Sequence, residues 1–202
     1  MVLQRPIEST RHLGESLYGY AQLMSQETRK EAIARRVREN QGRRNRPAFL
    51  DGLSQAVGST IRPDPLLNLD VTDQVRAGLS TGYASALSGQ ATATRVFFSR
   101  DESLTALRFP ELMAKPLAEE RVLLWLKQSA ECGAVILIAG QVLRASELIR
   151  ALDGDAVSML SEDRTQGFIF DKNDGDATET FEISVWGSRW LAAASACGIG
   201  ST

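Results

Sequence analysis

The spacing of apolar residues changes near residue 90, and this change constrains the fold more than any other feature of the sequence. Before it, apolar residues recur every three or four positions, which places them along one face of a helix. One such series is Leu50, Leu53, Val57 and Ile61. After residue 90 the apolar residues fall in short runs rich in β-branched and aromatic side chains, as is typical of strands.

These runs predict the order of the elements. Strands are expected at 92–98, 134–139, 156–160, 167–171 and 180–186. Helices are expected around 13–24, 33–37, 50–61, 70–87, 103–109, 116–130, 142–152 and Trp190. We therefore expect an α+β protein in which a helical N-terminal half packs on a mixed β-sheet of about five strands. The helical subdomain would span residues 1–90 and the α/β subdomain residues 91–197, as one continuous globular unit.

Proline and glycine mark the expected helix ends. The segment 42–47, GRRNRP, is expected to interrupt the N-terminal helices. Ser99–Glu102 has the pattern of a capping box, which opens a short helix that Pro110 is expected to end. Pro116 is expected to open a further helix that continues to Ala130.

The chain has a single histidine, His12, among its 202 residues. Histidine is the side chain most often used for proton transfer near neutral pH, and it is the commonest metal ligand. Ser-His-Asp triads, Cys-His dyads and zinc sites built on histidine pairs all need a histidine that can reach the other members. The sequence therefore argues against these enzyme classes, and we expect no cofactor and no bound metal.

Several features are typical of a cytoplasmic protein. Cys132 and Cys197 lack CxxC spacing and are too few for a disulfide framework, which favours inert thiols in a reducing compartment. The longest apolar run, Ala134–Ala139, is far shorter than the roughly 18 residues that span a bilayer. The N-terminus also lacks the apolar core of a signal peptide. We expect a cytoplasmic protein without a membrane partner.

Residues 78–82, GLSTG, match the GxSxG pattern of serine hydrolases. That chemistry needs a strand before the serine, a helix after it and a histidine later in the chain. Here the pattern lies within an expected helix, and His12 lies upstream. The sequence therefore favours a helix face of small residues that allows close packing, with Ser80 playing no catalytic role.

Residues 171–179, DKNDGDATE, are the best candidate for a cation site. With Asp171 as the first ligand, Asn173 is the third and Glu182 the twelfth, as in a calcium loop. The glycine is misplaced, because Gly175 is fifth rather than sixth. The expected flanking elements are strands, and Asp-Gly between two strands is a strong hairpin signal. The sequence favours a hairpin turn.

The net charge of −2 conceals a division along the chain. Residues 29–46 contain eight Lys and Arg residues against two Glu residues. This basic segment could neutralise phosphates, although no aromatic side chain among these charges could stack on a base. A solvated helix face is the favoured interpretation, and a nucleic-acid surface is the alternative. The arginines of that alternative are Arg35, Arg36, Arg38, Arg43, Arg44 and Arg46.

The acidic stretch 153–182 holds nine carboxylates against Arg164 and Lys172. Seven of the nine fall at expected loops or strand ends, where they could form one negative face that attracts a basic protein. Trp186 falls on the polar phase of its strand and could anchor such a contact. The seven carboxylates are Asp153, Asp155, Glu162, Asp163, Asp171, Asp174 and Asp176.

Three hypotheses of function follow. The first is a non-catalytic inhibitor, of the immunity-protein or antitoxin kind, whose acidic C-terminal surface covers a basic partner such as a nuclease-type toxin. The second is a nucleic-acid-binding module that uses the basic segment. The third is a metal-dependent hydrolase built on Asp171, Asp174 and Asp176. The sequence favours the first hypothesis, on charge and on the lack of a catalytic constellation.

Overall fold

A computed structural model describes residues 29–153, 156–175 and 178–198. The chain divides into two compact units, residues 1–38 and residues 39–202. Helix α2 (Arg29–Val57) begins in the first unit, and the other described elements lie in the second. Residues 39–90 thus belong to the same unit as the sheet. None of the described helices combines the length and apolar character needed to cross a membrane.

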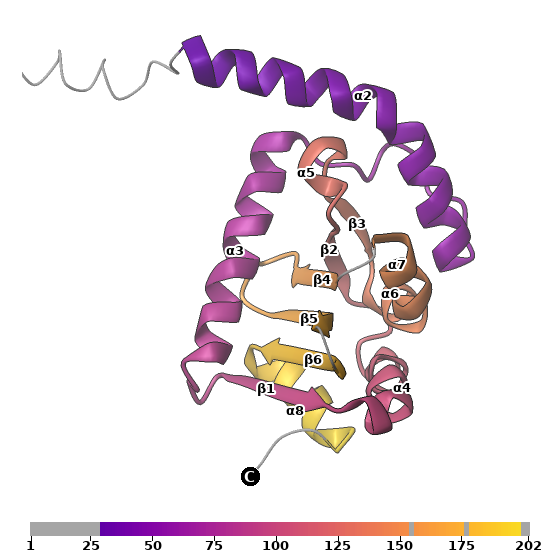
Figure 1. The fold of residues 1–202 in the computed structure, drawn as a ribbon, viewed down its shortest axis with the longest axis vertical. Helices are drawn as coiled ribbons and strands as arrows, with labels where there is room; N and C mark the ends of the chain where they lie inside the picture. Colours follow the sequence, from indigo (N-terminus) through magenta and orange to yellow (C-terminus); the bar gives the residue numbers. More distant parts are fainter. Residues whose placement is uncertain (1–28, 154–155, 176–177, 199–202) are drawn as a thin grey trace, which may run out of the picture. The chain divides into compact units, whose positions relative to one another are not determined.

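The second unit is built on a six-stranded sheet with the order β1-β6-β5-β4-β2-β3 (Figure 1). Every pair of neighbouring strands is antiparallel. The α+β prediction is confirmed, but the sheet is antiparallel with six strands rather than mixed with about five. The strands are β1 (Ala93–Phe98), β2 (Arg121–Trp125), β3 (Val135–Ile138), β4 (Ala156–Ser161), β5 (Gly167–Gly175) and β6 (Thr178–Trp186).

The additional strand is β2, whose residues were expected to be helical, and that prediction is wrong. Val122, Leu123 and Leu124 are all buried, because helices cover both faces of the sheet at this strand. A strand covered on both faces has a continuous apolar run instead of an alternating one. Periodicity does not distinguish such a short run from part of a buried helix.

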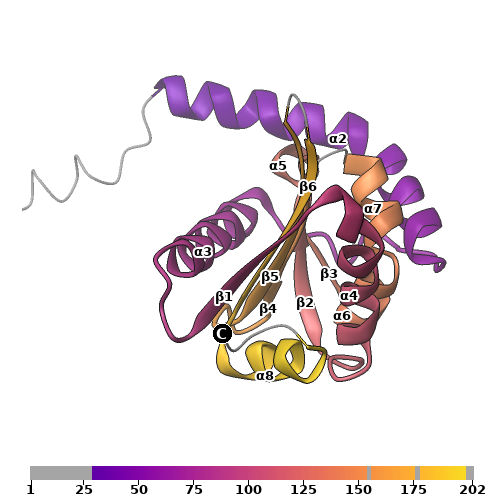
Figure 2. The same cartoon turned by 60° about the horizontal axis from the view of Figure 1, so that its bottom comes forward.

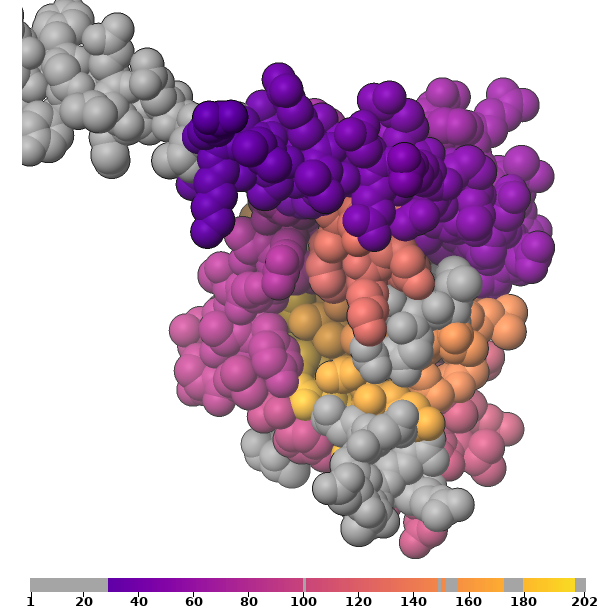
Figure 3. All heavy atoms as spheres, turned by 45° about the horizontal axis from the view of Figure 1, so that its top comes forward, coloured from indigo at the N-terminus to yellow at the C-terminus, as the bar shows by residue number. Residues whose placement is uncertain are grey.

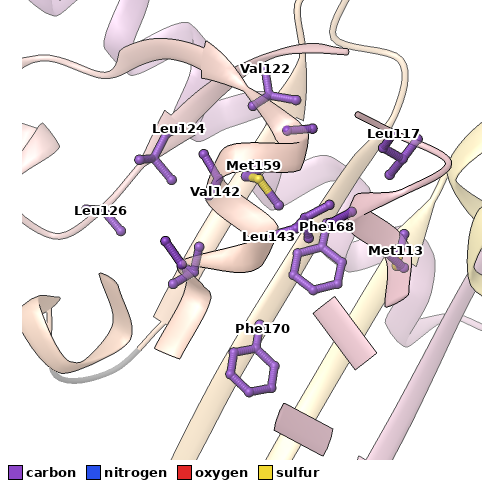
Figure 4. Packing of buried hydrophobic residues seen from close by; sticks show 14 of the residues in the cluster. Met113, Leu117, Val122, Leu124, Leu126, Val142, Leu143, Met159, Phe168 and Phe170 are labelled. Atoms are coloured by element: carbon purple, nitrogen blue, oxygen red, sulfur yellow. The ribbon is translucent and has the colours of Figure 1, made fainter. Parts of the chain in front are cut away.

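Helices lie on both faces of the sheet (Figure 2). Helix α3 (Leu69–Leu87) crosses one face, where Val75 and Leu79 pack with Leu123 and Leu160. The other face carries the larger core, formed with α4 (Ser103–Ala114) and α6 (Ala139–Arg144). Helix α7 (Ser146–Asp153) places Arg150 over the rings of Phe170 and Phe181 on this face. At its centre the side chains of α6 meet Met159 and Phe168 of the sheet (Figure 4). The remaining helices of the described residues are η1 (Arg100–Glu102), α5 (Ser129–Cys132) and α8 (Ser188–Ala196).

Two expected helix breaks do not occur. Helix α2 continues through 42–47 with Pro47 inside it, and α4 continues through Pro110. In α2, tertiary contacts offset the lost backbone hydrogen bond. Buried Gly42 lies against the backbone of Glu131, and Arg46 Nε donates to the Cys132 carbonyl at 2.8 Å. Figure 3 shows the atoms of α5, in salmon, directly against those of α2.

The predicted hairpin is confirmed, and the predicted capping box forms in part, because the Glu102 amide bonds the Ser99 carbonyl instead of the Ser99 hydroxyl. The Ser99 amide and hydroxyl donate to the Glu102 carboxylate at 3.0 and 2.9 Å. Strands β5 and β6 pair in register from Gly167↔Trp186 to Gly175↔Thr178. The two residues between them, 176 and 177, lie outside the described residues.

Candidate functional site

The predicted acidic residues do not form one face, because they lie at two opposite ends of the strands. Asp171 pairs with Ala156 at the start of β4, whereas Glu162 and Asp163 follow the end of β4. Strand β4 has six residues, which separates the two ends by about 17–20 Å. The prediction of a single negative face is therefore wrong. We call the end that contains Asp171 the hairpin end and the other the turn end.

Three of the five carboxylates predicted in the segments 153–155 and 171–176 belong to described elements. Asp153 is the last residue of α7, and Asp171 and Asp174 belong to β5. Asp155 and Asp176 lie outside the described residues. Asp171 is half-buried. The pairing of β4 with β5 brings these segments together although they are about 20 residues apart in the sequence.

The two carboxylates at the turn end have local partners. The Asp163 carboxylate accepts hydrogen bonds from the Ser161 hydroxyl at 2.5 Å and from the Thr165 amide at 3.1 Å. The bonds from Ser161 and Thr165 hold the pKa of Asp163 below its usual value. Glu162 forms an exposed ion pair with Arg121 at 3.3 Å. Asp163 thus stabilises its own turn, which leaves little of the predicted acidic surface at this end.

Glu182 is buried in an ion pair and cannot contribute to an exposed acidic surface. Only 2% of the residue is exposed. Arg95 Nε and Nη2 each donate to its carboxylate at 2.7 Å, and the Ser184 hydroxyl donates at 3.1 Å. Burial would raise the pKa of Glu182, but hydrogen bonds from Arg95, Tyr83 and Ser184 outweigh it and lower that pKa. The pair ties β1 to β6.

No pattern in the sequence singles out Arg95. Arg95 lies 87 residues from Glu182, and no local pattern connects them. The sequence does contain the alternation of side chains between the two faces of a strand. Arg95 in β1 and Glu182 in β6 both lie on the same face of the sheet. That face lies against α3, which supplies Tyr83 to the same group.

Trp186 is buried, so its predicted role as an exposed contact anchor is wrong. Only 6% of the residue is exposed, and it packs with Val75 and Leu79 of α3. Trp186 lies on the face of β6 that α3 covers, so this face is not solvated. A Cβ atom at Gly82 would lie 2.0 Å from the Trp186 ring, and one at Gly167 would lie 2.2 Å from it. The ring is held between these glycines.

The GxSxG segment is a packing surface within α3, as predicted. Gly82 lies against Trp186, and a Cβ atom at Gly78 would lie 2.8 Å from a Leu160 methyl group. Ser80 is exposed, and its hydroxyl donates to the Arg76 carbonyl of the preceding turn at 3.0 Å. The nucleophile elbow of serine hydrolases needs a strand before the serine, which is absent here because the whole segment is helical.

We therefore expect the Ser80→Ala variant to retain the stability of the wild type within about 0.5 kcal/mol, because an exposed serine that bonds its own helix contributes little. Its binding properties should also be unchanged. Thermal unfolding and the binding measurements proposed below would check this. A variant that lost function while melting at the wild-type temperature would contradict the packing interpretation.

The predicted basic surface is partly used for packing. Arg46 is half-buried and bonds the Cys132 carbonyl, while Asn45 Nδ2 donates to Glu131 at 3.1 Å. Arg43 and Arg44 are exposed. The other three arginines, Arg35, Arg36 and Arg38, belong to the part of α2 that lies in the first unit. Arg46 is thus used in part for packing, and the predicted nucleic-acid set stays a prediction.

The hypothesis of a metal site stays untested. No group of three or more histidine, cysteine or acidic side chains is close enough to hold a metal ion among the residues that the structure describes. The side chains of Asp174 and Asp176 and all of His12 fall outside the description. Both thiols are free: Cys132 is buried, and burial raises the pKa of Cys132 and of Cys197.

The hairpin end is the candidate binding surface. The backbone positions of Asp153, Asp171 and Asp174 come from α7 and β5, and the pairing of β4 with β5 brings these elements to one end of the sheet. Comparison of the chain with protein-family models, with curated proteins and with solved structures finds no match.

Proposed function

We propose that the protein is a non-catalytic binding protein that inhibits a basic protein partner through its hairpin end. The pairing of Asp171 with Ala156 supports this most directly, because it joins two acidic segments into one region. Residues 153–156 and 171–179 contain six carboxylates and a single basic residue, Lys172. A surface of this charge repels nucleic acid and attracts a cationic protein.

The chemistry of the partner follows from this charge. A protein that handles nucleic acid, such as a nuclease-type toxin, presents a basic surface to phosphates. An acidic inhibitor could cover that surface and exclude the substrate. Complementary charge acts mainly on the rate of encounter, and salt screens it over about 8–10 Å near physiological ionic strength.

Neutralisation of the hairpin end should slow association with the partner. The hairpin-end variant combines Asp153→Asn, Asp171→Asn and Asp174→Asn. A matched control removes the same charge at three exposed positions elsewhere, through Asp64→Asn, Glu111→Gln and Glu119→Gln. The partner would first be isolated by crosslinking in the source cells, and its association rate measured by stopped flow. We expect the hairpin-end variant to associate about tenfold more slowly at low salt. The control should differ little from the wild type.

The same measurements separate the hypotheses. The difference between the hairpin-end variant and the control should shrink as salt rises. Equal rates for the two at low salt would refute the proposed surface. A nanomolar complex with an oligonucleotide, lost on Arg36→Glu, Arg43→Glu and Arg44→Glu, would instead support the nucleic-acid-binding alternative.

A further inference from the structure

A cleft of about 600 Å³ lies at the turn end, away from the candidate binding surface. One wall is a face of α3, where residues from Gly78 to Ser85 line it at helical spacing. The opposite walls are residues 164–166 of the β4–β5 turn and residues 186–188, which lead into α8. All of these residues belong to the part of the chain that the structure describes.

Gln166 lines this cleft, and hydrogen bonds hold its side-chain amide in one orientation. The residue is only 9% exposed, and its Oε1 accepts hydrogen bonds from the backbone amides of Arg189 at 2.9 Å and Trp190 at 3.2 Å. These two bonds cap the start of α8 and set the orientation of the side-chain amide. Nε2 is therefore the group left over. It has no partner among the described residues, yet it is not sealed from solvent.

The charge around the cleft favours an anion. Arg164 lines the cleft and donates from Nη1 to Gln74 at 2.7 Å, and no carboxylate lines it. The neighbouring Asp163 directs its carboxylate to Ser161 and Thr165. Capping by Gln166 also polarises its amide, because an oxygen that accepts two bonds makes the attached N–H groups stronger donors.

We infer that this cleft binds a small molecule through an anionic oxygen, from a carboxylate or a phosphate, held between Arg164 and Gln166 Nε2. A donor fixed in a nine-tenths buried side chain requires no ordering when the ligand arrives. An anionic acceptor also gains charge-assisted hydrogen bonds from both groups. This site is separate from the hairpin end, and its test does not depend on the proposed protein partner.

The substitution Gln166→Glu tests the inference without removing the helix cap. A carboxylate can still accept both α8 amides, and negative charge is favourable at a helix N-terminus. The thermal stability of Gln166→Glu should therefore equal or exceed that of the wild type. At the position of Nε2, however, the variant has an oxygen that repels an anion. Anion binding should be lost in a protein that is fully folded.

Sodium phosphate and sodium acetate serve as probes, at an ionic strength held constant with sodium chloride. The readout is the pair of side-chain N–H signals of Gln166 in ¹⁵N-labelled protein, which Gln166→Glu identifies by their disappearance. For the wild type we expect a shift that saturates with at least one probe below about 100 mM, since a few hydrogen bonds to a small anion give millimolar affinity. Saturation with phosphate alone would identify a phosphate site.

Two arginine variants complete the experiment. Arg164→Gln should weaken binding about tenfold, through the loss of a charged hydrogen bond. Arg144→Gln, which removes an exposed charge in α6, should leave it unchanged. The inference is overturned if neither probe gives a saturable shift. It is also overturned if the two arginine variants weaken binding equally, because the effect would then reflect only the overall charge.

Discussion

Replacing Arg95 with methionine should lower the free energy of unfolding by about 3 kcal/mol. The substitution leaves the Glu182 carboxylate buried without its cation, and breaking such a pair costs more than the pair itself contributes. The estimate lies at the low end of the usual range because 27% of the Arg95 side chain is exposed, so water partly replaces it. Urea unfolding at neutral pH would measure the difference.

The pH dependence identifies the cause. In the wild type the pKa of Glu182 is lowered, so its contribution to stability is complete above the ordinary carboxyl pKa and is lost as the pH falls through the lowered value. In Arg95→Met, burial should instead raise that pKa, and protonation at acid pH would relieve the penalty. The difference in the free energy of unfolding between the wild type and Arg95→Met should therefore become smaller as the pH falls from about 7 to about 5.

A double variant provides the control. Glu182→Gln removes the buried charge at nearly constant shape, and in the Arg95→Met background it should recover part of the lost stability. If the double variant were less stable than Arg95→Met at neutral pH, the buried charge would not be the source of the loss.

Gly82→Ala should destabilise the protein by about 2 kcal/mol, although alanine is the better helix former by up to about 1 kcal/mol. A Cβ atom at Gly82 would overlap the Trp186 ring at 2.0 Å. The ring cannot retreat, because Gly167 approaches it on β5 and a Cβ atom there would lie 2.2 Å away. Either the ring or α3 must move, and both sit in a well-packed layer. Thermal unfolding would measure the loss.

Gly78→Ala is the matched control, since Gly78 lies one turn earlier in the same helix. Its Cβ atom would meet only the end of the Leu160 side chain at 2.8 Å, which a small rotation can relieve. We expect a change of less than about 1 kcal/mol in either direction, because helix propensity and crowding oppose each other. If the two variants lowered the stability equally, the close approach of the Trp186 ring to Gly82 and Gly167 would not be the cause of the loss in Gly82→Ala.

The sequence predicts those elements of the fold whose signals are local. The helix at 70–87, the Glu102 half of the capping box before α4 and the β5–β6 hairpin each depend on neighbouring residues, and each occurs. Strand β2 was missed because burial on both faces removes the alternation that identifies a strand. A helix break at 42–47 was expected because of Pro47. The free-energy cost of this proline is offset by contacts of α2 with α5, whose residues lie more than 80 positions away in the sequence.

The functional predictions were limited in the same way, because they depend on long-range contacts that local sequence patterns do not show. Sequence position predicts which carboxylates lie at strand ends, but not at which end of the sheet they lie. That depends on strand register, which places Asp171 and Asp163 at opposite ends of the sheet. Trp186 was assigned to solvent because alternation identifies two faces of a strand without showing that α3 covers the second. Gln166 has no sequence signal, because its role depends on the backbone of α8.

The position of β6 in the sheet has a consequence for synthesis. Among the strands that the structure describes, β1 is the first to be made, yet its only neighbour is β6, the last, and Ala93 pairs with Trp186. While the chain emerges from the ribosome, β1 has no strand partner, and β5 remains open on one side until residue 186 has been added. Such non-local pairing slows folding and exposes strand edges. Strand β6 then pairs with both β1 and β5, so the sheet is completed in a single late step.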